Sequence, residues 1–522
     1  MDDLTGEPLP CRVYLQDKAG ASLMVTPGEP GATALPYREQ WVPMPGVTEQ
    51  HTTVSAHSFR AELKPGDYTI EIERGKEYLP LQESFTMREQ PCQRTFRLKR
   101  WINLASLGWY SGETHVHRRI VELTNVMQAE DLNIAFPVTF WTVRSDRPPD
   151  LAPSPLRSQG PSPFGSREDR GAAPIWIEKN RVILPRNTEY EVFSVGAKRH
   201  TLGAMFLLNH RTVFTQTAPP VAAVAAQAHA EGALVDLDKH SWPWSMMLVP
   251  VAKVDLFELS NNSVWRTRFG FNALPAGLPA WMNLEKDSPN TLTEWGWLKY
   301  GFEAYYALLN CGFRISPSAG TASGVHPVPL GYSRVYVHLG DEFTPERWIA
   351  GLKASRSFVT TGPMLFAKVN GKLPGEAFES QNEEPQTIQL EIETASEKPL
   401  SEIEIVINGR VNERVVPSAT RSDAGAWQSH LQRRVKIIDS SWLAVRCVEP
   451  QPDGRKRFAH TGPWHVTLAG RPVTPRREQA LWLVELVERE IERNRPVLAP
   501  DALAEYEQAL RVYRGILEGS RP

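Results

Sequence analysis

The sequence predicts a multi-domain protein of the α/β plus all-β class, with a central α/β unit between two all-β segments and a helical hairpin at the end. Three patterns support this class. Apolar and polar residues alternate near both ends of the chain, strand-like runs alternate with helical segments in the middle, and apolar residues keep helical spacing beyond residue 476. A chain of 522 residues, 41% of them apolar, has room for about three or four domains and a sizeable core.

Residues 1–100 are expected to form a small β-sandwich that serves as a structural or docking module. Half-buried strands alternate apolar and polar side chains, and this pattern occurs at residues 12–16, 58–63, 67–73 and 95–99. Pro65-Gly66 and Gly75 indicate turns between these runs.

Residues 101–365 are expected to form an α/β unit. Apolar strand-like runs occur at residues 133–139, 204–208, 233–237 and 254–259. Helical segments at 221–231 and 294–311 each end at a glycine. This alternation implies a parallel sheet or barrel, which gathers functional residues at the carboxyl ends of its strands. Residues 146–174, rich in Pro, Gly and Ser, form a long irregular insertion that either covers a site or is an inert surface loop.

The C-terminal part is predicted to contain a second β-sandwich at residues 366–470 and a helical hairpin at 471–522. Strand patterns recur at residues 386–392, 403–407 and 441–446. In the hairpin, the apolar stripe is expected to pack on the body of the protein or to form a homo-oligomer with a second subunit.

Charge and composition exclude several classes of function. A formal net charge of −2 provides no basic field for nucleic acid or an anionic membrane. No apolar run approaches the roughly 18 residues of a membrane span. The first residues lack the features of a signal peptide, which predicts a cytoplasmic protein, or an exported one if the true start lies upstream. The four cysteines have no C-x-x-C spacing, which argues against a thiolate zinc site.

The strongest chemical signal is the pair His115 and His117. Residues i and i+2 of a strand point to the same face, so both rings are expected to meet at one point. A surface strand could carry two solvated histidines, but the apolar residues that precede this pair, such as Trp109 and Tyr110, indicate a buried strand. Buried imidazoles need partners, and a metal ion is the favoured one.

Further ligand-type residues stand near the ends of other predicted strands. They are Glu189, Glu191, His200, Asp236, Asp238, His240 and Glu258. Each has an ordinary alternative: Glu189 as a solvated neighbour of Glu191, for example, or Asp238 as a partner of Lys239. Without sulfur ligands, nitrogen and oxygen donors favour zinc, manganese or iron over copper.

The run Gly-Trp-Tyr-Ser-Gly-Glu-Thr-His-Val-His at residues 108–117 resembles the opening motif of the PHP (polymerase and histidinol phosphatase) metallohydrolases. It is most similar to the CehA/McbA (carbaryl hydrolase-like) branch. Similar motifs follow around Glu191, at His200-Thr-Leu-Gly, at residues 232–240 and 254–258, and later at 309–314, 331–337 and 355–363. The resemblance covers about residues 100–365. It implies a distorted PHP-type (β/α)7 barrel with one to three metal ions at its mouth and the hydrolysis of esters, carbamates or phosphoesters.

The chain departs from the family pattern at three places. Glu113 stands where the family has Asp, residues 137–141 lack an Asp-His pair, and Ala322 replaces a late Asp, unless His326 returns to the site. These gaps argue against a trinuclear cluster. We therefore expect one or two zinc or manganese ions, held by His115, His117, Glu191, His200 and His240.

Asp238 or Glu113 is expected to orient ligands or transfer protons, and metal-bound hydroxide to attack the substrate. Most of the 16 tryptophans are explained by core packing. Trp141, Trp242 and Trp244, with His326, are expected at the barrel mouth, where they would bind a small-molecule or glycan-like substrate by stacking.

Two other hypotheses remain open from the sequence. The first is a catalytically degenerate barrel that binds a ligand or glycan. The second is a scaffold that assembles through its terminal helices and its β-sandwiches.

Overall fold

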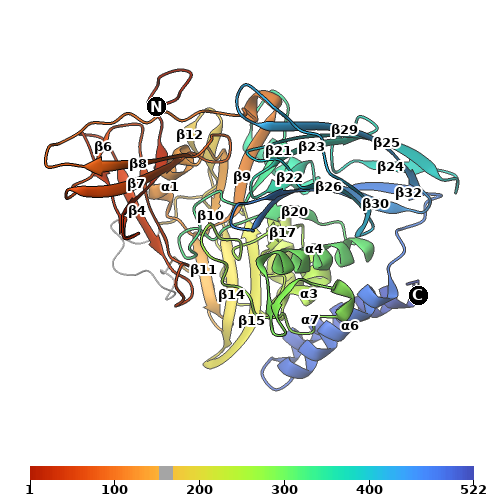
Figure 1. Ribbon diagram of the computed structural model, residues 1–522. Coiled ribbons are helices and arrows are strands. Elements are labelled where there is room, and N and C mark those ends of the chain that lie inside the picture. Colours follow the sequence, from red (N-terminus) through yellow and green to blue (C-terminus); the bar gives the residue numbers. More distant parts are fainter. Residues whose placement is uncertain (152–167, 522) are drawn as a thin grey trace.

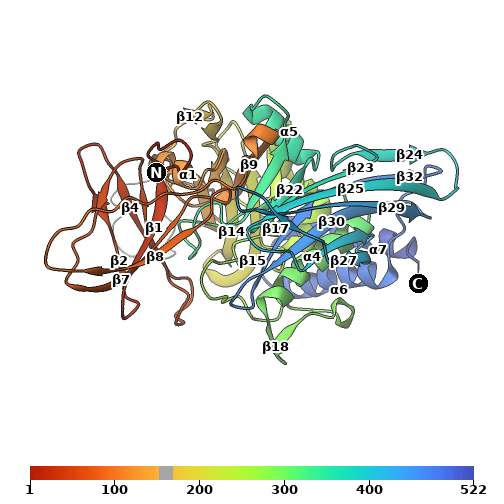
Figure 2. The same ribbon diagram turned by 45° about the horizontal axis from the view of Figure 1, so that its top comes forward.

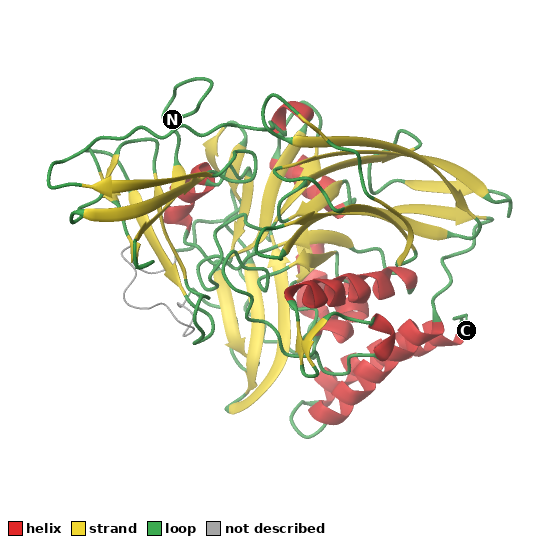
Figure 3. Cartoon of the chain, in the orientation of Figure 1, coloured by secondary structure: helices red, strands yellow, loops and turns green. Residues whose placement is uncertain are grey.

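A computed structural model describes residues 1–151 and 168–521 and has a mixed α/β fold with several sheets and seven helices, α1 to α7 (Figure 1). The N-terminal strands lie on one side of the molecule, the C-terminal strands on the other, and the central unit between them. Most of the helical residues gather on one side of the central strands (Figure 3). Of the predicted irregular insertion at 146–174, residues 152–167 lie outside the described residues.

The N-terminal segment is all-β. Its main sheet has the antiparallel order β4-β5-β1-β7-β8, with β2 paired to β1, while β3 pairs with β6. The strands are β1 (Cys11–Asp17), β2 (Ser22–Leu23), β3 (Thr26–Pro27), β4 (Ala34–Glu39), β5 (Glu49–Val54), β6 (Phe59–Arg60), β7 (Gly66–Glu73) and β8 (Leu81–Met87). Alternating residues such as Val13, Leu15, Ile70 and Ile72 form its core.

The predicted strands at 12–16 and 67–73 are confirmed as β1 and β7. The strand predicted at 95–99 is wrong, because this segment forms only one isolated bridge, between Asp2 and Leu98. The run at 58–63 contributes only the two residues of β6. The alternation is real in both runs, but a strand also needs a neighbour of matching length, which no periodicity reveals.

The central unit contains two large sheets and a small sheet in which β18 pairs with β19. In the first, β13, β10 and β9 run parallel and β21 pairs antiparallel with β9; in the second the order is β11-β14-β15-β16-β17-β20. The strands of this unit are β9 (Trp109–Val116), β10 (Ile134–Pro137), β11 (Phe140–Arg144), β12 (Ile175–Glu178), β13 (Arg181–Ile183), β14 (Thr188–Val195), β15 (Lys198–Leu208), β16 (Leu234–Leu237), β17 (Leu256–Ser260), β18 (Lys286–Ser288), β19 (Thr291–Leu292), β20 (Ser316–Ala319), β21 (Arg334–His338) and β22 (Ser357–Thr360).

The two central sheets meet where the chain leaves β20. The Ala322 N–H donates to the His115 carbonyl at 2.8 Å, and the His117 N–H donates to the Ser323 carbonyl at 2.8 Å. The end of β9 therefore lies against the segment that follows β20, and side chains from both sheets face one interior.

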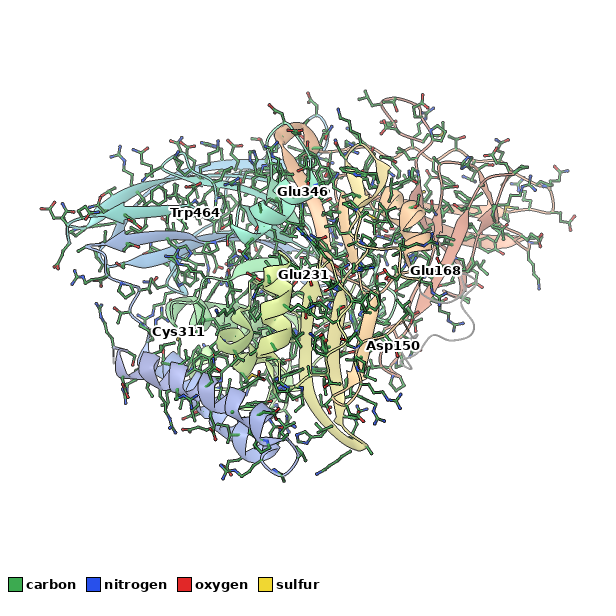
Figure 4. The ribbon with its side chains drawn as sticks, turned by 180° about the vertical axis from the view of Figure 1, so that it is seen from behind. Asp150, Glu168, Glu231, Cys311, Glu346 and Trp464 are labelled. Carbon is green, nitrogen blue, oxygen red and sulfur yellow. The ribbon has the colours of Figure 1, made fainter. Side chains whose placement is uncertain are left out.

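The helices of the central unit are α1 (Ile120–Ala129), α2 (Ala222–Ala230), α3 (Ser245–Leu248), α4 (Glu294–Asn310) and α5 (Pro345–Lys353). As predicted, α2 and α4 end before glycines in the left-handed region, Gly232 with φ 82° and Gly312 with φ 88°. Figure 4 shows, from behind, the outer face of the central sheet, with Glu231 at the end of α2 and Cys311 at the end of α4. On the opposite side α1 lies against the N-terminal sheet (Figure 2), and its Asn125 side chain donates to the Thr53 carbonyl at 3.2 Å.

The first central sheet continues into the C-terminal segment. It has twelve strands: ten in the order β12-β13-β10-β9-β21-β22-β31-β30-β26-β27, with β32 paired to β30 and β24 paired to β32. The junction is β22 against β31, antiparallel, so the sheet crosses the predicted boundary at residue 365. The strands of this segment are β23 (Met364–Val369), β24 (Ala377–Ser380), β25 (Gln386–Ser396), β26 (Glu402–Ile407), β27 (Arg410–Val415), β28 (Thr420–Arg421), β29 (Trp427–Ile437), β30 (Ser441–Pro450), β31 (Lys456–Thr461) and β32 (Trp464–Leu468).

A second C-terminal sheet, β23-β25-β29-β28, packs against this extended sheet. The core between them includes Trp101, Leu104 and Trp109, which precede or begin β9. The residues that lead into β9 are therefore buried, as expected, but in the C-terminal core.

Two helices, α6 (Arg477–Asn494) and α7 (Pro500–Glu518), form the predicted hairpin and pack on the central unit (Figure 1). Tyr513 donates its hydroxyl to the Met246 carbonyl at 2.7 Å. The Glu505 carboxylate accepts from the N–H groups of Val221 and Ala222, at 2.8 and 2.7 Å, and so covers the start of α2. None of the helices in the described ranges is both long and apolar enough to cross a membrane.

Candidate metal centre

The two histidines of the opening motif share one face of the chain at the end of β9. All eight residues of β9 are buried between β10 and β21. His117 follows the last residue of the strand, but its backbone bond to Ser323 keeps the chain extended there. The two Nε2 atoms consequently lie 3.1 Å apart.

Glu189 on β14 brings the third ligand-type atom to this point. Its Oε2 lies 3.3 Å from Nε2 of His117. Together, His115, His117 and Glu189 offer one nitrogen or oxygen each, all within 4.8 Å of one another. The three side chains, which we call the triad, are 0%, 4% and 0% exposed.

Aromatic side chains from the neighbours of β14 enclose the imidazoles. Glu189 pairs in register with Trp141 of β11 and with Phe206 of β15. The Trp141 ring lies 4.6 Å from the His117 ring, and the Phe206 ring lies 4.4 Å from the His115 ring. The strand register therefore sets both the third donor and the apolar wall around it.

The triad fits a divalent metal ion. Donor atoms on one tetrahedral zinc ion lie about 3.3 Å apart, and two imidazoles with one carboxylate are a donor set of catalytic zinc sites. The 3.1 Å and 3.3 Å separations here are close to that value. Oε2 of Glu189 is also buried and accepts no hydrogen bond from the residues that the structure describes. A buried carboxylate oxygen of this kind calls for a cation or a donor.

The second ring nitrogen of His115 faces carboxylates. Its Nδ1 lies 3.2 Å from Oε1 of Glu258 on β17 and 3.7 Å from Oδ2 of Asp238. Burial, and then the positive charge of Lys239, hold the pKa of His115 well below its usual value, so the ring is neutral. If the single N–H of the His115 ring is on Nδ1, facing Glu258, then the lone pair of Nε2 is free to bind a metal ion between the three triad side chains.

Lys239 stands beside the triad among carboxylates. Its Nζ lies 2.9 Å from Oε1 of Glu189, 3.0 Å from Oε1 of Glu191 and 2.5 Å from Oδ2 of Asp238. Burial lowers the pKa of Lys239, but these three carboxylates outweigh it and raise the pKa well above its usual value. Burial raises the pKa of Glu189. The buried carboxylates of this part of the interior are therefore stabilised by positive charge.

Two of the predicted ligands on β14 and β15 lie outside the triad. Glu191 shares a face with Glu189 but lies two residues further along β14, where its carboxylate pairs with Lys239. His200 hydrogen-bonds through Nε2 to Oδ1 of Asn494 on α6, at 2.7 Å. It precedes Phe206 by six residues on β15, about 20 Å along an extended strand, which removes it from the triad.

His240 also points away from the triad. Its ring stacks on Phe257 and Tyr300, with centroid distances of 5.0 and 5.7 Å. Extrapolating strand alternation from Asp236 and Asp238 to this residue fails, because β16 ends at Leu237 and the chain turns. Burial lowers the pKa of His240 to about 4.

The two predicted catalytic carboxylates have different surroundings. Asp238 contacts His115 and Lys239, in a position to orient the imidazole. Glu113 accepts hydrogen bonds from the N–H and hydroxyl of Thr321 and from the Gly331 N–H. Both its oxygens are occupied in fixing this loop, and burial raises its pKa to about 8. The longer side chain at this position thus serves the loop that follows β20.

Of the predicted substrate-binding residues, Trp141 lies against His117, as described above. Trp242 is part of a pocket shared with the terminal hairpin, and its ring lies 5.5 Å from Nζ of Lys239. Trp244 is fully buried and belongs to the main hydrophobic core. His326 is 2% exposed and stacks on Trp41, with a centroid distance of 3.9 Å. Its Nε2 lies 3.1 Å from Nδ2 of Asn262.

Several residues of the centre escape sequence reasoning. Glu189 and Glu191 share a face, so only the pairing with β11 and β15 distinguishes them. The place of Glu258 near the end of an apolar run identifies it as a ligand-type residue, but not as the partner of His115. The sequence offers Lys239 only as a partner of Asp238, a pair that the structure confirms, and gives no sign of its contacts with Glu189 and Glu191. The contribution of Trp41 from the N-terminal segment has no signal in the pattern.

Comparison of the chain with protein-family models, with curated proteins and with solved structures finds no match.

Proposed function

We propose that this protein is a metal-dependent hydrolase that cleaves an ester, carbamate or phosphoester bond. The observation that carries the proposal is the convergence of His115, His117 and Glu189 within 4.8 Å in the interior. The resemblance of residues 108–117 to PHP metallohydrolases of the CehA/McbA branch supports the same reaction class. The two central sheets that meet at β9 and β20 are, in this proposal, a distorted barrel of that superfamily.

Each residue of the centre has a role in this proposal. When bound, a zinc or manganese ion lowers the pKa of a coordinated water and polarises the carbonyl or phosphoryl oxygen of the substrate. His115 and His117 bind through Nε2, and Glu189 through its carboxylate. Glu258 holds the tautomer of His115. Asp238 is suited to move a proton, because its Oδ1 accepts no hydrogen bond within the described ranges.

The substrate is proposed to be a small molecule or a glycan-like compound with a planar or ring-shaped part. Trp141 supports this, because its ring lies 4.6 Å from that of His117, at the edge of the triad. An indole face beside a reacting centre stacks on aromatic or sugar rings.

Hydrolysis of activated esters by metal-loaded and chelator-treated protein tests the proposal. A panel of p-nitrophenyl carboxylate, carbamate and phosphate esters covers the three bond types. We expect metal-dependent turnover of at least one ester, lost in His117→Ala and retained in His200→Ala. Turnover by chelator-treated protein or by His117→Ala that equals the turnover of the metal-loaded wild type would contradict the proposal.

A further inference from the structure

The carboxylates beside the triad form a second group that converges on Lys239. Glu189, Glu191 and Asp238 each place one oxygen within 3.0 Å of its ammonium nitrogen. These three carboxylates, with Lys239 at their centre, are called here the lysine cluster. Lys239 is 6% exposed, so its charge is held in the interior.

Glu189 belongs to both groups and uses a different oxygen in each. Oε2 faces the triad, 3.3 Å from Nε2 of His117, while Oε1 lies 2.9 Å from Nζ of Lys239. A carboxylate with one oxygen toward each of two cations is the arrangement of a bridging ligand. The triad and the lysine cluster are thus adjacent cation positions that share Glu189.

Without the ammonium of Lys239, the three carboxylates of the lysine cluster would suit a metal ion. Three buried carboxylates repel one another and need compensating positive charge. Three oxygen donors without nitrogen or sulfur suit a hard divalent ion such as Mn²⁺ or Mg²⁺. Lys239 supplies a cation to the same oxygens, and no chelator can remove it.

From this arrangement we infer that the ammonium of Lys239 takes the place of a second metal ion, so that the centre binds one divalent ion only. The inference rests on the proposed function, since the first ion is the one held by the triad. Lys239 also acts as a positioning residue, because it holds Oε1 of Glu189 and thereby leaves Oε2 toward His117.

Manganese stoichiometry tests the inference without reference to activity. The full-length protein, Lys239→Met and Lys239→Arg are saturated with Mn²⁺, freed of excess ion and analysed for metal per chain. Lys239→Met keeps the length of the side chain without its charge, and Lys239→Arg is the matched control that keeps the charge. We expect one Mn²⁺ per chain in the wild type and in Lys239→Arg, and two in Lys239→Met.

The electron paramagnetic resonance spectrum gives a second readout. Ions of a two-metal site lie about 3.5–4 Å apart, so the Mn²⁺ spectrum of Lys239→Met should show a spin-coupled pair and that of the wild type an isolated ion. A double variant, Lys239→Met with Glu191→Gln, removes one carboxylate oxygen donor and one negative charge from the lysine cluster. It is expected to bind one ion.

Each outcome decides the question. Two Mn²⁺ in the wild type, one in Lys239→Met, or a Lys239→Met protein that stays unfolded even with Mn²⁺ overturns the inference about Lys239 and leaves the proposed function standing. A wild type that binds neither Mn²⁺ nor, in a parallel sample, Zn²⁺ overturns the proposed function itself.

Discussion

Oε1 of Glu258 lies 3.2 Å from Nδ1 of His115, on the side of the ring opposite to the nitrogen that faces His117. The two residues come from different sheets, β17 and β9, and meet because β20 lies between them in space. The orientation of the imidazole therefore depends on how the two sheets are joined.

His115→Ala with His117→Ala should abolish metal binding, because two of the three donors are lost. Elemental analysis of the purified proteins measures this. The matched control is His200→Ala, which removes a histidine that hydrogen-bonds to Asn494 instead. Equal metal content in the double variant and in the control would show that the triad does not hold the ion.

Glu258→Gln should weaken metal affinity about 10–100-fold, since removing a carboxylate that orients a ligating imidazole has effects of this size. Competition with a chelator of known affinity measures the change. Glu303→Gln, on α4, is the control and should leave the affinity unchanged. An unchanged affinity in Glu258→Gln would remove the orienting role.

Gly320→Ala should lower metal affinity by displacing His115. A Cβ at this position would lie 2.2 Å from Cβ of His115 and 2.4 Å from Oε1 of Glu258, so one of them must move. Gly515→Ala on α7 is the control, because its Cβ would meet no atom within 4 Å. That control should be slightly stabilising, by about 0.5–1 kcal/mol. Chelator competition and thermal unfolding report the two effects.

His240→Phe should keep the metal and make the protein less sensitive to acid. Burial lowers the pKa of His240 from 6.5 to about 4 in the folded protein, so the unfolded chain binds the proton more readily. The stability from the neutral ring is present above pH 6.5 and is lost as the pH falls through 4. The upper limit of this contribution to the free energy of unfolding is about 3 kcal/mol.

Phenylalanine keeps the stack on Phe257 and Tyr300 without a titrating group. Thermal midpoints of the wild type and of His240→Phe, measured between pH 7 and 4, should diverge toward acid. Parallel pH profiles would contradict this account, and loss of metal would assign His240 to the centre.

Glu505→Gln should destabilise the contact between the hairpin and α2. The carboxylate accepts from the N–H groups of Val221 and Ala222, where a negative charge also complements the helix dipole. We expect a loss of about 1 kcal/mol, as for other N-terminal caps. Urea unfolding compares it with Glu507→Gln, an exposed neighbour on α7 that should have no effect.

Much of the fold can be predicted from local pattern. The glycines after α2 and α4, the alternation in β1 and β7 and the stripe of the terminal hairpin each identify an element, because each is decided by neighbours in sequence. The order of strands in the sheets is decided by long-range pairing, so the continuation of the central sheet through β22 and β31 is invisible in the sequence.

The candidate site shows the same division. His115 and His117 can be predicted to share a point because two residues of one strand carry them. The third donor depends on which residue of β14 stands opposite Trp141 and Phe206, and the pattern favours Glu191 as much as Glu189. The prediction of His240 as a ligand fails because periodicity does not reveal that β16 stops at Leu237.

The antiparallel ladder between β22 and β31 makes the C-terminal segment the neighbour that completes the edge of the central sheet. A chain cut after residue 365 would expose the backbone N–H and C=O groups of β22 as a bare edge, ready to associate with the edge of another molecule. Shortened forms are therefore expected to precipitate, even though every triad residue would still be present.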